Sequence, residues 1–145
     1  MTTPVLRSTI AALACAGALA IAAPSMAAST NFKATLNAAS EVPPNDSKGS
    51  GTLTATYDDA SKKLTWKGSV TGLSGPATAA HFHGPAEAGK NAGVAVPISG
   101  ADSGSFEGSA TLTDAQASDL MAGHWYVNVH TATNKGGELR GQLTK

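Results

Sequence analysis

The stretches AAHFH at residues 79–83 and WYVNVH at residues 125–130 decide the fold class of this chain. Apolar and polar side chains alternate in both, and an extended strand points successive side chains to opposite faces. In the second stretch the tryptophan and both valines share one face, while Tyr126, Asn128 and His130 share the other. Both stretches are therefore predicted to be strands that turn one face to an apolar core and present histidines on the other.

Similar runs recur about every ten to fifteen residues along the chain after the N-terminal segment. They predict strands at residues 32–37, 52–57, 64–70, 77–83, 94–98, 105–112, 124–131 and 138–144. Thr113 followed by Gln116 predicts the start of one short helix, which Gly123 ends. About eight strands, one short helix and no strand–helix alternation predict an all-β fold, an antiparallel Greek-key β-sandwich or barrel.

The predicted core consists of the large apolar residues on the inward strand positions. They are Phe32, Leu53, Leu64, Trp66, Phe106, Trp125, Val127, Val129, Leu139 and Leu143. Asp58 to Ser61 is predicted to be the turn of a hairpin. Pro97 predicts that the strand at 94–98 lies at a sheet edge, because proline donates no hydrogen bond to a neighbouring strand.

Residues 1–27 resemble a secretory signal peptide. Arg7 precedes an apolar run over residues 10–21, Pro24 ends the run, and small residues up to Ala27 suit a signal peptidase. The run is shorter than the roughly 20 residues that span a bilayer as a helix. Cys15 leaves a lipoprotein signal as an alternative, although few apolar residues precede it. We expect cleavage after residue 27 or 28, a periplasmic or secreted protein, and a single β domain over residues 28–145.

Cleavage would remove the only cysteine, so the mature chain would have no disulfide and no thiolate ligand. The chain has ten Lys and Arg against ten Asp and Glu, and loss of Arg7 leaves the remainder close to neutral. No basic stripe is present, so nucleic acid is not an expected partner. The mature chain has no further long apolar run, so we expect no transmembrane anchor in it. We also expect a monomeric or weakly associating protein.

Four motifs resemble the CHRD (chordin) domain family: AHFHGPA at 80–86, GVAVP at 93–97, GHWYVNVHT at 123–131 and GELRGQL at 137–143. The stretch EVPP at 41–44 fits the same pattern. The motifs follow the expected order over nearly the whole mature chain. The resemblance implies an extracytoplasmic β domain, of a kind that occurs singly in bacterial secreted proteins and as repeats in animal chordin. It implies no catalytic activity.

A more distant similarity is to copper/zinc superoxide dismutase, a Greek-key barrel that also uses a His-x-His strand pair. That family uses six histidines and an aspartate for two bridged metals, and a disulfide. This chain has four histidines in all, and its one cysteine lies in the N-terminal segment. We therefore expect that the protein is not an enzyme.

His81, His83 and His130 are the candidate ligands of one metal ion. The first two share a strand face about 6–7 Å apart. Imidazole binds copper, zinc and nickel. A given set of ligands binds Cu(II) more tightly than the other two ions, so Cu(II) is expected ahead of Zn(II). A regular strand would place His124 about 20 Å from His130, which excludes it from the same site.

A ligating imidazole also needs a partner for its second ring nitrogen. Tyr126, Asn128 and Glu138 are the candidates for that role. Glu138 and Arg140 share a strand face, where an ion pair is expected rather than recognition of a charged ligand.

The alternative is that His81 and His83 bind loop carbonyls and hold the turn that follows them. The domain would then be a structural, protein-interaction or adhesion module without bound metal, whose partner is an unknown extracytoplasmic protein.

Overall fold

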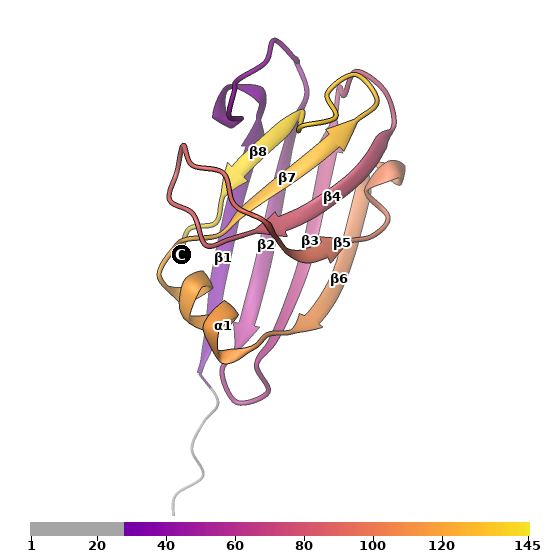
Figure 1. Ribbon diagram of the computed structural model, residues 1–145. Coiled ribbons are helices and arrows are strands. Elements are labelled where there is room, and N and C mark those ends of the chain that lie inside the picture. The colour runs from indigo at the N-terminus through magenta and orange to yellow at the C-terminus, as the bar shows by residue number, and fades with distance from the viewer. Residues whose placement is uncertain (1–27) are drawn as a thin grey trace, which may run out of the picture.

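The computed structural model describes residues 28–145, and the predicted signal peptide at residues 1–27 lies outside the described residues. Eight antiparallel strands form one sheet that curls into a nearly closed barrel (Figure 1). The strands are β1 (Ser29–Asn37), β2 (Ser50–Asp58), β3 (Lys63–Thr71), β4 (Ala77–His83), β5 (Val94–Ile98), β6 (Ser105–Thr111), β7 (Tyr126–Thr131) and β8 (Leu139–Gln142). Their order in the sheet is β5-β4-β7-β8-β1-β2-β3-β6, and the two end strands β5 and β6 approach each other where the barrel closes. The all-β prediction of about eight strands and one short helix is confirmed.

Alternation of side chains explains the strands that form the rear of the barrel in Figure 1. In β3 every second residue is buried, from Leu64 to Val70, and the residues between them are exposed. β2 pairs with β3 over its full length, from Ser50 opposite Thr71 to Asp58 opposite Lys63. The carboxylate of Asp58 accepts hydrogen bonds from the Ser61 amide at 2.7 Å and hydroxyl at 2.6 Å, which closes the predicted hairpin turn.

The barrel interior is apolar, and all ten predicted core residues are buried in it. At its centre the ring of Phe82 contacts Trp66 edge-on at 5.1 Å and Trp125 at 5.8 Å between centroids. Gly108 on β6 lies against the Trp66 indole, where a Cβ atom would come within 2.6 Å of the ring. Position 108 therefore requires a glycine, because a side chain there would collide with the Trp66 indole.

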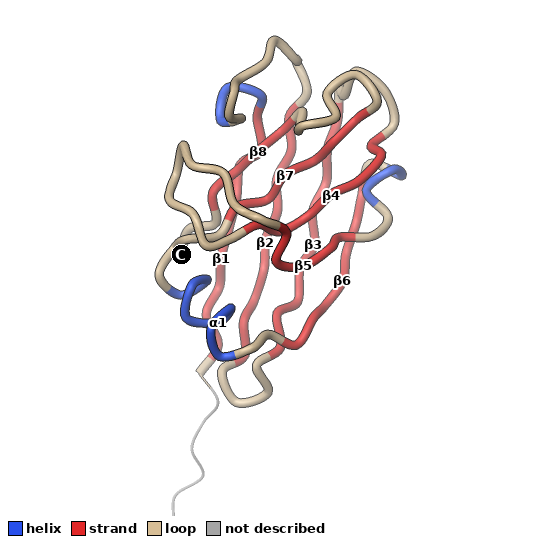
Figure 2. Tube along the Cα trace, in the orientation of Figure 1, coloured by secondary structure: helices blue, strands red, loops and turns tan. Residues whose placement is uncertain are grey.

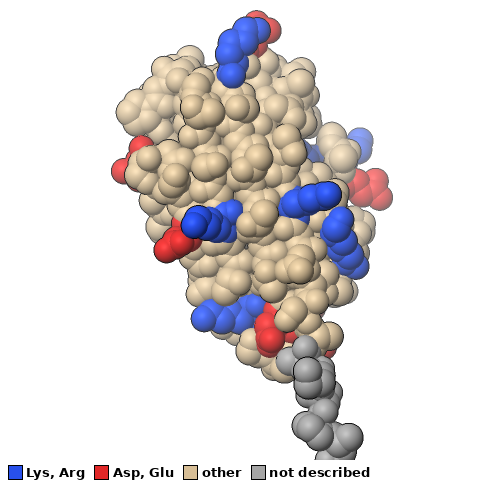
Figure 3. All heavy atoms as spheres, turned by 180° about the vertical axis from the view of Figure 1, so that it is seen from behind, with Lys and Arg blue, Asp and Glu red and all other residues tan. Residues whose placement is uncertain are grey.

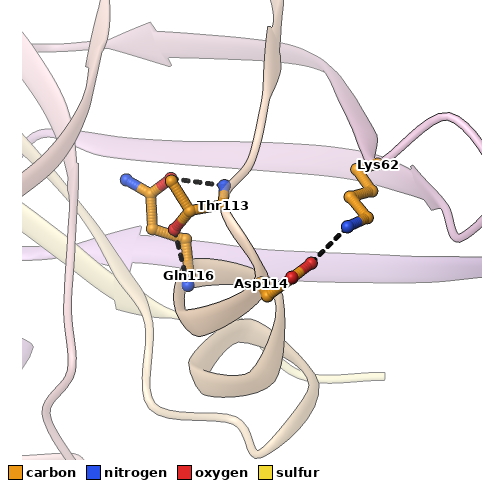
Figure 4. A network of polar contacts seen from close by, with 4 residues as sticks. All are labelled: Lys62, Thr113, Asp114 and Gln116. Atoms are coloured by element: carbon orange, nitrogen blue, oxygen red, sulfur yellow. Dashed lines mark hydrogen bonds and ion pairs between the residues drawn. The ribbon is translucent and has the colours of Figure 1, made fainter.

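The short helix α1 (Asp114–Met121) follows β6 and packs Leu120 into the core. Its first turn has the predicted capping box: Thr113 Oγ1 accepts from the Gln116 amide at 3.2 Å, and Gln116 Oε1 accepts from the Thr113 amide at 3.0 Å (Figure 4). Lys62, beside the β2–β3 turn, pairs with Asp114 at the helix start. These contacts fix the segment that leads from β6 to β7. Among residues 28–145 no helix is both long enough and apolar enough to cross a membrane.

Loops lie at the ends of β4, β7 and β8 and cover part of their outer face; Figure 2 shows these loops in tan. The β4–β5 loop reaches over β8, where Arg140 Nη2 donates to the Lys90 carbonyl at 2.5 Å and Gln142 Nε2 donates to the Ala86 carbonyl at 2.9 Å. For this reason Tyr126 and Asn128, on the polar face of β7, are each only 3 % exposed. Both faces of β7 are therefore buried from Tyr126 to Val129, while His130 is half-buried.

The face of the barrel turned away in Figure 1 is exposed. In Figure 3 its lysine, arginine and acidic side chains are scattered among uncharged ones, with neither sign gathered into a stripe. The outward positions of β2 there are Thr52, Thr54 and Thr56. The buried charged side chains of the described residues, Glu41, Glu138 and Arg140, lie instead on the side that loops cover.

Candidate metal centre

Strand pairing between β4 and β7 places three histidines beside one another. Ala79 faces His130, His81 faces Asn128, and His83 faces Tyr126. His81 and His130 are thus diagonal neighbours on adjacent strands. Ala80 and Phe82, on either side of His81, point into the core.

The three imidazole rings form one compact cluster, referred to below as the histidine cluster. Ring centroids lie 5.5 Å apart for His81 and His83, 5.1 Å for His81 and His130, and 6.4 Å for His83 and His130. One nitrogen from each ring lies within 4.8 Å of the other two. A tetrahedral ion with bonds of 2.0–2.1 Å needs its ligand nitrogens about 3.3 Å apart. His81 Nδ1 and His130 Nε2, at 3.2 Å, already have this separation.

Two main-chain carbonyls fix the tautomers of the cluster. His83 Nδ1 lies 3.0 Å from the Ala92 carbonyl oxygen, and His130 Nδ1 lies 2.9 Å from that of Lys135. A carbonyl oxygen only accepts, so both Nδ1 atoms carry the proton and both Nε2 atoms can accept, as that of His130 does from His81 Nδ1. His83 Nε2 is buried and has no hydrogen-bond partner among the described residues.

The surroundings of His81 and His83 lower the pKa of both side chains and so favour the neutral imidazole, the form that binds metals. Burial lowers the pKa of His81, and the neighbouring His130 and His83 lower it further. Burial also lowers the pKa of His83, and its bond to the Ala92 carbonyl offsets this only in part. Arg140 adds to the lowering at His83, because a second positive charge disfavours protonation.

Tyr126 supports the ring of His83. The two rings stack with centroids 4.9 Å apart and planes inclined by only 4°. The Arg140 guanidinium carbon lies 3.5 Å from the Tyr126 ring centroid. The Tyr126 hydroxyl donates to the Ala92 carbonyl at 3.3 Å and accepts from the Ala92 amide at 3.1 Å. Tyr126 thus braces the loop residue that orients His83, rather than bonding the imidazole itself.

The other two residues expected to support the histidines are engaged elsewhere. Asn128 donates through Nδ2 to Glu41 Oε1 and, at 3.4 Å, to the Leu139 carbonyl. The Glu138 carboxylate accepts hydrogen bonds from Ser47, Ser74, Thr131 and Asn134. The partners of His83 and His130 are main-chain carbonyls, which leave no signal in the sequence.

The expected ion pair between Glu138 and Arg140 is absent among the described residues, and that expectation is wrong. Arg140 Nη1 donates to Asn91 Oδ1 at 2.9 Å and Nη2 donates to the Lys90 carbonyl. Burial alone would raise the pKa of Glu138, but its hydrogen bonds outweigh burial and lower the pKa to about 2. The two side chains satisfy different loops, because each end of β8 is covered by its own loop.

Glu41 is a buried acid that the sequence analysis did not single out beyond the EVPP motif. Its side chain is 5 % exposed, and burial raises its pKa to about 7. The hydrogen bond from the Val42 amide and the positive charge of Arg140 lower the pKa, but by less than burial raises it. It lines a depression of about 320 Å³ together with Arg140 and Gln142. The signal in the sequence was its place next to two prolines in a family motif.

His124 lies outside the histidine cluster, as the strand spacing predicts. Its main-chain amide donates to the Asp119 carbonyl at 3.0 Å, and its carbonyl accepts from the Ala86 amide at 2.7 Å. It thus connects the end of α1 to the start of the β4–β5 loop. The side chain is half-buried.

Comparison with known proteins gives one match. The sequence profile of the CHRD domain family matches residues 32–143, a range that includes the histidine cluster and nearly all of the barrel. No curated protein and no solved structure was found to match the chain.

Proposed function

The chain belongs to the CHRD domain family, and we propose that it is an exported binding module that holds one copper ion through His81, His83 and His130. One observation carries this proposal. His83 Nε2 has a free lone pair, is buried, and has no partner among the described residues. The other two imidazoles stand beside it.

A buried acceptor without a partner costs about 1–3 kcal/mol, so such groups are rare unless they have a further role. A metal ion between the three rings would give His83 Nε2 its missing partner. It would also replace the hydrogen bond between His81 and His130, which joins two nitrogens at ligand spacing. For His81 to bind through Nδ1, its ring proton would move to Nε2.

Copper is proposed ahead of zinc on the chemistry of the donors. The cluster offers three imidazoles and includes no thiolate or carboxylate. Such a set suits both ions, and Cu(II) binds more tightly than Zn(II) when the two compete. Three protein ligands also leave a fourth position open, as in metal sites that take an exogenous ligand.

Calorimetric titration with Cu(II) and Zn(II) tests the proposal, using protein purified without a histidine tag. We expect saturable binding of one equivalent, tighter for Cu(II), and its loss in His83→Ala. The matched control is His124→Ala, which removes an imidazole outside the cluster and should bind as the wild type does. Absence of saturable binding, or equal binding by His83→Ala, would refute the metal site.

Export, the monomeric state and the absence of catalysis belong to the same proposal. Arg7 and the apolar run at 10–21 support export to the periplasm or beyond. Cell fractionation would test this, and recovery in the cytoplasm would count against it. Light scattering should give the mass of one chain. The copper-loaded protein should remove superoxide no faster than a buffer blank.

A second candidate is a structural or protein-interaction module in which the histidines hold loops. Its support is the pair of ring-to-carbonyl bonds from His83 to Ala92 and from His130 to Lys135. In that case protein from copper-supplemented medium would carry no stoichiometric metal. His83→Ala would then lower the melting temperature without any metal-dependent difference.

A further inference from the structure

One side of the histidine cluster is open. His83 is 9 % exposed, while His81 and His130 are half-buried and line a depression of about 450 Å³. The remaining lining residues of this depression come from β4 and from the end of β7 with the loop that follows it. They are Thr78, Ala79, Thr131, Ala132 and Lys135.

A bulge in β4 shapes the depression. The register between β4 and β7 shifts between Ala77 and Ala79, and Thr78 at the shift is exposed and lines the depression. Bulges commonly redirect a side chain in this way. The Thr131 hydroxyl, by contrast, already donates to the Glu138 carboxylate at 2.5 Å. The Thr78 hydroxyl has no hydrogen-bond partner among the described residues and is open to the depression.

The charge of the lining has a single sign. Lys135 is the one charged side chain among the residues that line the depression, and none of them is acidic. Its carbonyl orients His130, and the residue is exposed and lines the depression. Arg140 adds a positive charge on the His83 side.

A four-coordinate ion held by three imidazoles keeps one coordination position free. His83 is covered by the Tyr126 ring and the β4–β5 loop, so solvent reaches the cluster from the side of His81 and His130. The free position would therefore open into the depression. Three neutral imidazoles would leave the full charge of a divalent ion on the side of the depression that Lys135 helps to line.

We propose that this depression is a binding site for a small anion, which coordinates the metal ion at its free position and is attracted by the Lys135 ammonium group. The inference rests on the proposed copper site. The ligand class is a small monoanion, either inorganic or a carboxylate. Two positive groups on one side of a shallow site attract an anion and repel a cation.

Azide titration of the copper-loaded protein tests the inference, followed by the charge-transfer absorption of the copper–azide complex. We expect a saturable band in the wild type. Lys135→Gln should raise the azide Kd about threefold at low ionic strength, which is the effect of one unit charge several Å away across solvent. The Cu(II) affinity should not fall, because the substitution keeps the carbonyl that orients His130 and removes a positive charge that repels the ion.

The matched control is Lys67→Gln, which removes an exposed lysine of β3 and should leave the azide Kd unchanged. In about 0.5 M sodium perchlorate the difference between wild type and Lys135→Gln should vanish, because salt screens exposed charges. Copper binding at wild-type affinity with no azide band, or equal azide Kd values in Lys135→Gln and wild type, would overturn the anion site alone. Failure to bind copper would overturn both the anion site and the proposed function.

Discussion

We predict that the carboxylate of Glu138 stabilises the side of the barrel where loops pack on β7 and β8. It is fully buried and accepts hydrogen bonds from the Ser47 hydroxyl at 2.6 Å, the Ser74 amide at 2.7 Å and hydroxyl at 2.5 Å, and the Thr131 hydroxyl at 2.5 Å. Ser47 and Ser74 belong to two different loops, and Thr131 is the last residue of β7. Glu138→Gln keeps the size of the side chain but replaces one acceptor oxygen by a donor amide, which would face donors.

The expected magnitude follows from the pKa of this group. Its hydrogen bonds overcome burial and lower the pKa from 4.5 to about 2. A group whose pKa is lower in the folded state stabilises the fold above its unfolded pKa and loses that effect as the pH falls through its folded pKa. The ionised carboxylate should therefore contribute about 3 kcal/mol at neutral pH, and this contribution should disappear between about pH 4.5 and about pH 2.

Urea unfolding of wild type and Glu138→Gln at a series of pH values is the assay. We expect the variant to be less stable by about 3 kcal/mol at neutral pH and the two curves to converge near pH 2. The matched control is Glu107→Gln on the exposed side of β6, which should change the free energy of unfolding by less than about 0.5 kcal/mol. A loss below about 1 kcal/mol for Glu138→Gln at neutral pH would refute the reasoning, as would a difference that does not shrink on acidification.

Three further outcomes are expected. Glu41→Gln should raise the free energy of unfolding by up to about 3 kcal/mol near pH 8 and change it little near pH 4. Burial raises the pKa of this carboxyl to about 7, so its ionisation destabilises the fold as the pH rises from 4.5. Lower stability of the variant near pH 8 in urea unfolding would contradict this. Copper binding should persist below pH 6.5, since burial lowers the pKa values of His81 and His83; calorimetry from about pH 7.5 to about pH 5 checks it, and half-loss at or above 6.5 would argue against it. Thr113→Ala should cost about 1 kcal/mol, because its hydroxyl oxygen caps the helix at the Gln116 amide; an unchanged urea midpoint would show that the cap is not needed.

Local patterns in the sequence were sufficient to predict the barrel strands and the helix. Alternation gave β4 and β5 with the observed bounds and placed Pro97 on an edge strand. Thr113 and Gln116 marked the start of α1 three residues apart. These features were predictable because the pleat and the capping box involve residues that are close in the chain.

The same periodicity put His81 and His83 on one face and His130 on the polar face of its strand. The sequence could not show that the two strands pair side by side, or that the pairing places His130 diagonal to His81. Register between strands depends on the whole barrel. The 3.2 Å contact between the two rings is therefore a tertiary result.

By itself, the sequence determined which residues face the core, where the helix starts, and that three histidines lie on polar strand faces. The tertiary structure alone decided that loops bury this polar face, that the Ala92 and Lys135 carbonyls set the histidine tautomers, and that Glu138 turns to Ser47 and Ser74 instead of Arg140. Side-chain alternation is a property of neighbouring residues in an extended chain. The folding of a loop over a distant strand, such as Ser47 onto Glu138, depends on contacts between residues far apart in sequence, which no local pattern records.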